Sequence, residues 1–245
     1  MARSTLPSSH LVHRAMDLFE RLRAEWQIRR EVDVPGLVAG VRARLEGRLE
    51  LRPHSLPGDL THLRGRLGLG ELQATAWSSP ELRKCVLVEV KAWPIIEGMA
   101  LTLLPHPERQ APILAADFMV LPTRMSANLE VYGPRELTRG LLAPARSTFA
   151  RLGWRPGPAW AAPMTSGEGL HARVSLRHVD ELFGAFTGAL GAYLDHLGAA
   201  PTGVDQTAAQ SRVFSLFHTH GPRARALGRM VGEVHGERLS RLLFE

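Results

Sequence analysis

The chain has 245 residues, of which 44% are hydrophobic, and a formal net charge of +6 at pH 7. This length and composition are typical of one soluble globular domain spanning residues 1–245. No apolar run reaches about 18 residues and no leader pattern opens the chain, so we expect neither a membrane span nor a secretion signal. A single cysteine, Cys85, excludes an intrachain disulfide, and these features together predict a cytoplasmic protein.

The positive charge comes almost entirely from arginine, because Lys84 and Lys91 are the only lysines. A coding bias toward arginine explains this as well as an acidic partner attracted by the summed positive field. Nucleic acid and an acidic protein, such as a small electron carrier, are two partners that such a field would attract. The sequence has no run of five basic residues and no aromatic residues interleaved with them, so nucleic acid is not favoured.

The first half of the chain changes from helical to extended patterning. Apolar residues at steps of three and four, such as Leu18, Leu22 and Trp26, predict a helix over 9–30, and a second helix over 35–47 begins at Pro35. Short segments rich in β-forming residues follow, separated by Gly, Pro or Ser, and predict an antiparallel meander. These segments are residues 47–53, 67–78, 83–93, 99–105, 113–122 and 126–133.

The second half returns to helices after a segment rich in Pro and Gly. Residues 151–169 predict an ordered loop or a lid, and 171–177 a further strand or an irregular lead-in. Helices are expected over 179–197, 203–217 and 222–244, and the glycines at 184, 188 and 191 are expected to let the first of them pack closely. Helices, a block of strands and more helices indicate an α+β fold, with an antiparallel sheet covered by helices.

Asp117 stands out because it interrupts the apolar run "PILAADFMVLP". Burying an unpaired carboxylate costs about several kcal/mol, so a buried aspartate is expected to have a partner or a function. Strand alternation places Asp117 on one face with Ala115 and Met119. Two interpretations remain open: a carboxylate satisfied by a neighbouring strand or an arginine, or a proton donor with a raised pKa.

Glu89 and the histidines near residue 220 are weaker candidates. Glu89 shares a strand face with Leu87 and Lys91, a pattern typical of a solvated face unless that face holds a ligand. His218 and His220 lie at a predicted helix break, but ligand partners at metal-site spacing are missing nearby, so we expect no metal. His220 therefore lies either in an exposed loop or in a pocket as a proton donor.

Separated blocks from residue 83 to the end of the chain resemble the ferredoxin-dependent bilin reductases. The resemblance rests on the order and spacing of the blocks, with Asp117 five positions after Pro112. The blocks are Arg83-Lys84 at a strand start, Pro105-His106-Pro107, Pro112 and Asp117, "MSANLEVYGP", "RPGPAW", and a last helix that ends in Leu-Phe. The first 80 residues match this family in outline.

The resemblance implies a three-layer α/β/α sandwich in which a central antiparallel sheet is flanked by helices. It implies that a linear tetrapyrrole, biliverdin IXα, binds between the sheet and the C-terminal helices. No metal and no cofactor would be held in the protein; an acidic ferredoxin would deliver electrons singly, and side chains would protonate the bilin radicals. The resemblance also implies a monomer. The sequence pattern itself argues against a membrane partner and against nucleic acid.

The resemblance also assigns roles to individual residues. Asp117 would donate a proton, Ser126 and Arg155 would bind the two propionates, and Trp160 would lie beside Arg155. Two positions depart from the family: Ala100 replaces a histidine, and His220 replaces a second aspartate whose role it could take. A family glutamate falls at Val88 or Glu89. The candidate catalytic residues are therefore Asp117, Glu89 and His220, and the candidate substrate-binding residues are Ser126, Arg155 and Trp160.

These departures leave open which reduction occurs, and two other functions are alternatives. The protein could perform a two-electron or a four-electron reduction of biliverdin. It could be a bilin-binding protein that has lost the chemistry, or a reductase of another open-chain tetrapyrrole.

Overall fold

The computed structural model describes residues 9–65, 68, 70–92, 95–155, 157, 159, 165, 169–220 and 222–243. The helices are α1 (Ser9–Glu31), α2 (Val34–Glu46), α3 (Gly58–Thr61), α4 (Arg135–Thr138), α5 (Ala143–Leu152), the 3₁₀ helix η2 (Leu176–His178), α6 (Val179–Ala199), α7 (Thr207–His220), α8 (Pro222–Val231) and α9 (Glu233–Leu242). The strands are β1 (Arg52–Pro53), β2 (His62–Arg64), β3 (Glu71–Ser78), β4 (Leu82–Ala92), β5 (Ile96–Pro105), β6 (Ile113–Val120), β7 (Arg124–Tyr132), β8 (Trp154–Arg155) and β9 (Leu170–Ser175).

Within these residues the strands form one antiparallel sheet in the order β1-β3-β4-β5-β6-β7-β9-β8, and β2 pairs with β3 beside β1. The predicted meander is confirmed, because β3 to β7 follow one another in the chain and in the sheet. Short turns between consecutive strands allow this antiparallel order. The segment 47–53 is the exception, since only Arg52–Pro53 pairs with the sheet.

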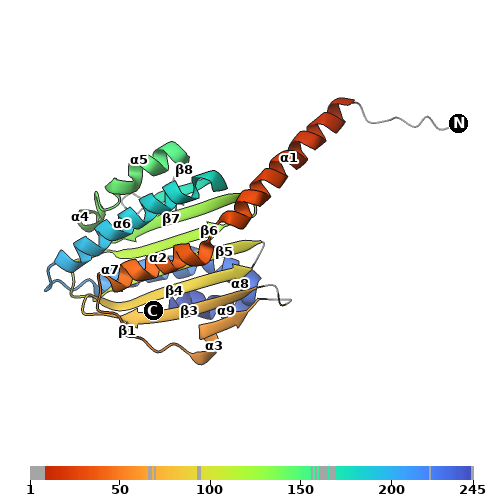
Figure 1. Cartoon of the computed structure of the whole chain (residues 1–245). Coiled ribbons are helices and arrows are strands. Elements are labelled where there is room, and N and C mark those ends of the chain that lie inside the picture. The colour runs from red at the N-terminus through yellow and green to blue at the C-terminus, as the bar shows by residue number, and fades with distance from the viewer. Residues whose placement is uncertain are drawn as a thin grey trace.

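Helices cover both faces of the sheet, which confirms the three-layer α/β/α sandwich (Figure 1). One apolar core joins α2, α5 and α6 to one face of the sheet, and a second joins α7, α8 and α9 to the other. Strand alternation divides each strand between the two cores. In β6, for example, Ala116 and Phe118 belong to the first core and Ala115 to the second.

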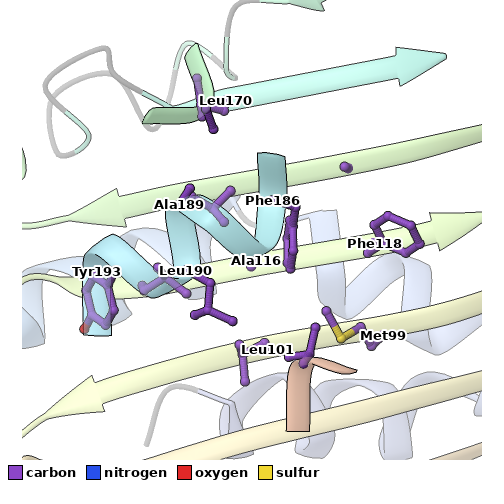
Figure 2. Close-up of a cluster of buried hydrophobic side chains, with 14 of the residues drawn as sticks. Met99, Leu101, Ala116, Phe118, Leu170, Phe186, Ala189, Leu190 and Tyr193 are labelled. Atoms are coloured by element: carbon purple, nitrogen blue, oxygen red, sulfur yellow. The ribbon is translucent and has the colours of Figure 1, made fainter. Parts of the chain in front are cut away.

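The first core packs against the face of β6 opposite to Asp117. Phe118 makes edge-to-face contacts with Phe183 and Phe186 of α6, with ring centroids 5.4 and 6.0 Å apart. Figure 2 shows Phe118 among the other buried side chains of this cluster. The hydroxyl of Tyr193 donates to the carbonyl of Pro112 at 2.7 Å, and complete burial raises the pKa of Tyr193. These contacts position the strand that carries Asp117.

The prediction of a single last helix over 222–244 is wrong, because this segment forms two helices. The chain breaks at Gly232, where φ is +95°, and continues as α9. A Cβ atom on Gly236 would overlap the backbone of Gly228, so the two helices meet at their glycines. Glycine tolerates both the positive φ and the close approach, which allows α8 and α9 to form a tight pair over the sheet.

Helix α1 anchors to the sheet near its C-terminal end, while its N-terminal part extends away from the other elements (Figure 1). The Arg29 side chain is completely buried and pairs with Glu97 of β5 at 2.5 Å. The hydroxyl of Ser175 in β9 donates to Glu25 at 3.2 Å. Among the described helices none is both long and apolar enough to cross a membrane.

We expect Gly188→Ala to raise the free energy of unfolding by about 0.5–1 kcal/mol, because alanine loses less backbone entropy in a helix. The expected close packing at Gly184 and Gly188 is wrong: both are exposed, and a Cβ atom at either would meet nothing within 4 Å. Urea unfolding of the purified variant measures the change. Gly236→Ala is the matched control and should lower stability, because its Cβ atom would overlap α8; a destabilised Gly188→Ala would contradict the prediction.

Candidate active site

Asp117 lies on the face of the sheet that α7, α8 and α9 cover. Its neighbour Ala115 belongs to the second core, whereas Ala116 and Phe118 point into the first. Ala116 and Phe118 are at most 1% exposed, but the Asp117 side of the strand is partly exposed. The same is true of Met119 on this face. A carboxylate in the middle of the sheet is therefore accessible from the side of the C-terminal helices.

Cross-strand pairing places Asp117 in a single row of residues across this face. The row runs Ala74 (β3), Val88 (β4), Ala100 (β5), Asp117 (β6), Asn128 (β7), His171 (β9) and Arg155 (β8). Directly paired residues of antiparallel strands project to the same side of a sheet. The row is apolar from β3 to β5 and polar from β6 to β8, so within the row the groups able to exchange protons lie on the β9 side of Asp117.

The polar half of the row is joined by hydrogen bonds. Nδ2 of Asn128 donates to Oδ1 of Asp117 at 2.7 Å, and Oδ1 of Asn128 lies 2.9 Å from Nδ1 of His171. Nε2 of His171 lies 2.7 Å from Oε1 of Glu130. The side chains of His171 and Glu130 are only 16% and 9% exposed. Asp117 is thus linked through an amide to a largely buried imidazole–carboxyl pair.

Two glycines pack against the His171–Glu130 pair. A Cβ atom on Gly157 would lie 3.0 Å from Nε2 of His171, and one on Gly169 would lie 3.2 Å from Oε1 of Glu130. The indole N–H of Trp154 donates to the carbonyl of Gly169 at 3.3 Å. The described ends of the 151–169 segment are therefore held against the buried pair.

Glu89 does not share the face of Asp117. It points toward α2, where Oε1 accepts from Arg42 at 2.8 Å, and its other oxygen lies 3.7 Å from Lys91. Val88 occupies the position in the row with Asp117. The strand register therefore places Val88, and not the carboxylate of Glu89, on the face of the candidate site.

Of the remaining predicted residues, the structure describes Ser126 and Arg155 fully, His220 in part and Trp160 not at all. Ser126 is partly exposed on the Asp117 face, two residues before Asn128 and opposite Met119. Arg155 is exposed on the edge strand β8, directly opposite His171. His220 is the last residue of α7, one of the helices on this side, and its side chain is outside the described part. Trp160 lies outside the described residues altogether.

Asn128, Glu130 and His171 are not among the site residues predicted from the sequence. A signal for the first two is present, since Ser126, Asn128 and Glu130 recur at a period of two in "MSANLEVYGP" and so share one strand face. For His171 the sequence holds no such signal, because nothing local shows that β9 pairs with β7. The structure brings these three residues to the candidate site.

The arrangement is suited to moving protons to a bound molecule. The partly exposed carboxyl of Asp117 accepts a hydrogen bond from Asn128. Asn128 in turn contacts the ionisable pair of His171 and Glu130. A serine hydroxyl and an arginine on the same face can hold acidic groups of a ligand. The apolar residues of β3 to β5 can contact an apolar ligand surface.

No family model matches this sequence. The structure is similar to that of phytochromobilin synthase from tomato in complex with biliverdin, with a TM-score of 0.77 and 17% sequence identity over 86% of this chain and 83% of that chain. It also matches PcyX, with a TM-score of 0.49 and 12% identity over 86% of this chain and 94% of that chain. The resemblance found in the sequence is confirmed as a shared fold: the chain has the fold of phytochromobilin synthase.

Proposed function

We propose that this protein is a bilin reductase, which reduces a linear tetrapyrrole of the biliverdin class with electrons from a ferredoxin. The observation that carries the proposal is the partly exposed Asp117 at the centre of the sheet, in a fold shared with a protein that binds biliverdin. The proposal includes a monomeric enzyme that acts in the cytoplasm.

The proposed reaction separates electron supply from proton supply. Reduction of one carbon–carbon double bond takes two electrons and two protons, and ferredoxin would supply the electrons one at a time. Asp117 would transfer a proton to the bilin after an electron arrives, which leaves a carboxylate that Asn128 already contacts through an N–H group. The net charge of +6 favours the approach of an acidic ferredoxin.

Substrate binding is assigned to the polar side chains near Asp117. The two propionates of biliverdin would contact Ser126 and Arg155, which both lie on strands beyond β6. Ala100 and Val88 would contact the apolar part of the tetrapyrrole. Trp160 is also assigned to substrate binding, and His220 is assigned the role of a second proton donor.

We expect Arg155→Ala to weaken biliverdin binding by roughly 1.5–3 kcal/mol, about 10- to 150-fold in Kd, since a hydrogen bond to a charged group is worth that much. Absorption titration of the variant with biliverdin IXα measures the affinity. Arg64→Ala, an exposed arginine on β2 at the other edge of the sheet, is the matched control. Unchanged affinity in Arg155→Ala would remove this residue from the site.

A bilin-binding protein without turnover is the second candidate. The observation that favours it is the apolar half of the row. Val88 and Ala100, which lie beside Asp117, have no ionisable group that could donate a proton to the ligand. Such a protein would bind the same ligand through the same face. A reductase of another open-chain tetrapyrrole would differ in the ligand that fits.

An anaerobic absorption time course with biliverdin IXα, ferredoxin and a reducing system tests the proposal. Conversion of the bound-bilin spectrum to a product that absorbs at shorter wavelength supports a reductase, and chromatography of the product identifies the bond reduced. A bound spectrum that never changes supports the binding protein. If biliverdin does not bind, the proposed ligand is wrong.

A further inference from the structure

Asn128 connects two ionisable sites that lie on different strands. Its amide contacts Asp117 of β6 through nitrogen and His171 of β9 through oxygen, and His171 in turn contacts Glu130. We infer that Asn128 couples Asp117 to the His171–Glu130 pair, so that the pair takes up a proton when Asp117 delivers one. This inference rests on the proposed function, in which Asp117 is the proton donor.

Hydrogen-bond donors and acceptors fix the proton count of the observed arrangement. Oδ1 of Asn128 accepts only, so Nδ1 of His171 must carry a hydrogen. A hydrogen must also lie between Nε2 of His171 and Oε1 of Glu130, which are 2.7 Å apart. Whether it resides on nitrogen or on oxygen, the pair holds one proton more than a neutral imidazole beside a carboxylate. Asp117 accepts from Asn128 in this arrangement.

Rotation of the Asn128 amide gives a second arrangement with the same number of protons. Oδ1 would then face Asp117, which must be a carboxylic acid to donate to it, and Nδ2 would donate to a bare Nδ1 of His171. The imidazole would be neutral and would still donate to Glu130 through Nε2. The proton that the pair held in the first arrangement is now on Asp117, and the total charge of the three groups is unchanged.

The two arrangements correspond to the acid before and after proton transfer. Asp117 as an acid gives its proton to the bilin and becomes a carboxylate; the His171–Glu130 pair takes one proton from solvent, and the amide turns its N–H groups toward Asp117. The loss of the pair's net negative charge and the Asn128 hydrogen bond both stabilise the new carboxylate. Asn128, His171 and Glu130 are therefore positioning residues of the reaction, and none of them needs to touch the bilin.

Two arginines of the sheet lie near this network. Arg155 lies opposite His171 on β8, and Arg173 follows two residues along β9; both are exposed. Gly157 and Gly169 cover the pair without adding a polar side chain.

The coupling can be measured without any bilin. The ¹⁵N chemical shifts of the His171 ring, followed against pH by NMR, report which ring nitrogens carry protons. Asp117→Asn removes the carboxylate that holds the N–H groups of Asn128, and the new amide can also donate to Oδ1 of Asn128. The amide of Asn128 is then free to turn, so His171 should lose its extra proton at a lower pH than in the wild type. Asp195→Asn, which neutralises an exposed carboxylate on α6, should leave the His171 titration unchanged. Identical titrations in Asp117→Asn and the wild type would overturn the inference.

The contribution to catalysis is tested with His171→Gln. Glutamine can still donate a hydrogen bond to Asn128, so a merely structural role would be preserved, but it cannot take up a proton. We expect unchanged biliverdin affinity, single-turnover reduction slower by roughly tenfold or more, and loss of the pH dependence that the pair contributes. A wild-type rate and pH profile in His171→Gln would overturn the catalytic role. If the wild type itself does not reduce biliverdin, the proposed function fails, while the NMR titration still decides whether the coupling exists.

Discussion

Asp117→Asn is expected to bind biliverdin normally and to reduce it roughly 100- to 10,000-fold more slowly, the range lost when a general acid is removed. Asparagine has almost the same shape and can hydrogen-bond to Asn128, so the face of the sheet stays intact. It cannot donate a proton to the reduced bilin. The first electron should still arrive, and a one-electron bilin radical should accumulate because its protonation is slow.

Stopped-flow absorption and electron paramagnetic resonance, recorded with reduced ferredoxin under anaerobic conditions, measure this outcome. Absorption titration measures biliverdin affinity in the same preparation. Asp195→Asn is the control, because it removes a carboxylate from the opposite layer and should reduce biliverdin at the wild-type rate. A wild-type rate in Asp117→Asn would refute the proton-donor role.

Gly98→Ala is expected to lower the free energy of unfolding by roughly 2–4 kcal/mol, from backbone strain and overpacking together. Gly98 in β5 has φ of +155°, a conformation that L-residues rarely adopt. A Cβ atom there would overlap the carbonyl oxygen of Phe118 in β6. Because that oxygen belongs to the backbone, the strands themselves must move apart.

The variant should also weaken ligand binding, since Gly98 precedes Ala100 by two residues and both pair with the strand of Asp117. Urea unfolding gives the stability change, and absorption titration gives the affinity for biliverdin. Gly188→Ala is the control, an alanine placed where nothing crowds it, and its effect should have the opposite sign. A Gly98→Ala midpoint equal to that of the wild type would show that β5 and β6 tolerate the added atom.

Local patterns in the chain were sufficient to predict the longer helices α1, α2, α6 and α7, the strands β3 to β7, and an antiparallel sheet covered by helices. The spacing of Leu18, Leu22 and Trp26 predicted α1, and the turn residues between short β-rich segments predicted the meander. Asp117 was recognisable because a charge in an apolar strand is costly. These signals depend only on neighbours along the chain. The sequence alone can reveal them because helix and strand periodicity are local properties.

Contacts between distant segments determined the rest of the candidate site. Whether Val88 or Glu89 faces Asp117 depends on strand register, and a slip of one residue reverses every side chain of β4. His171 reaches Asn128 because β9 pairs with β7 across 43 residues of sequence. The break at Gly232 arises where α9 folds back on α8. Hydrogen bonds and packing between strands and helices far apart in the chain leave no periodic trace in either segment, so no local pattern could reveal them.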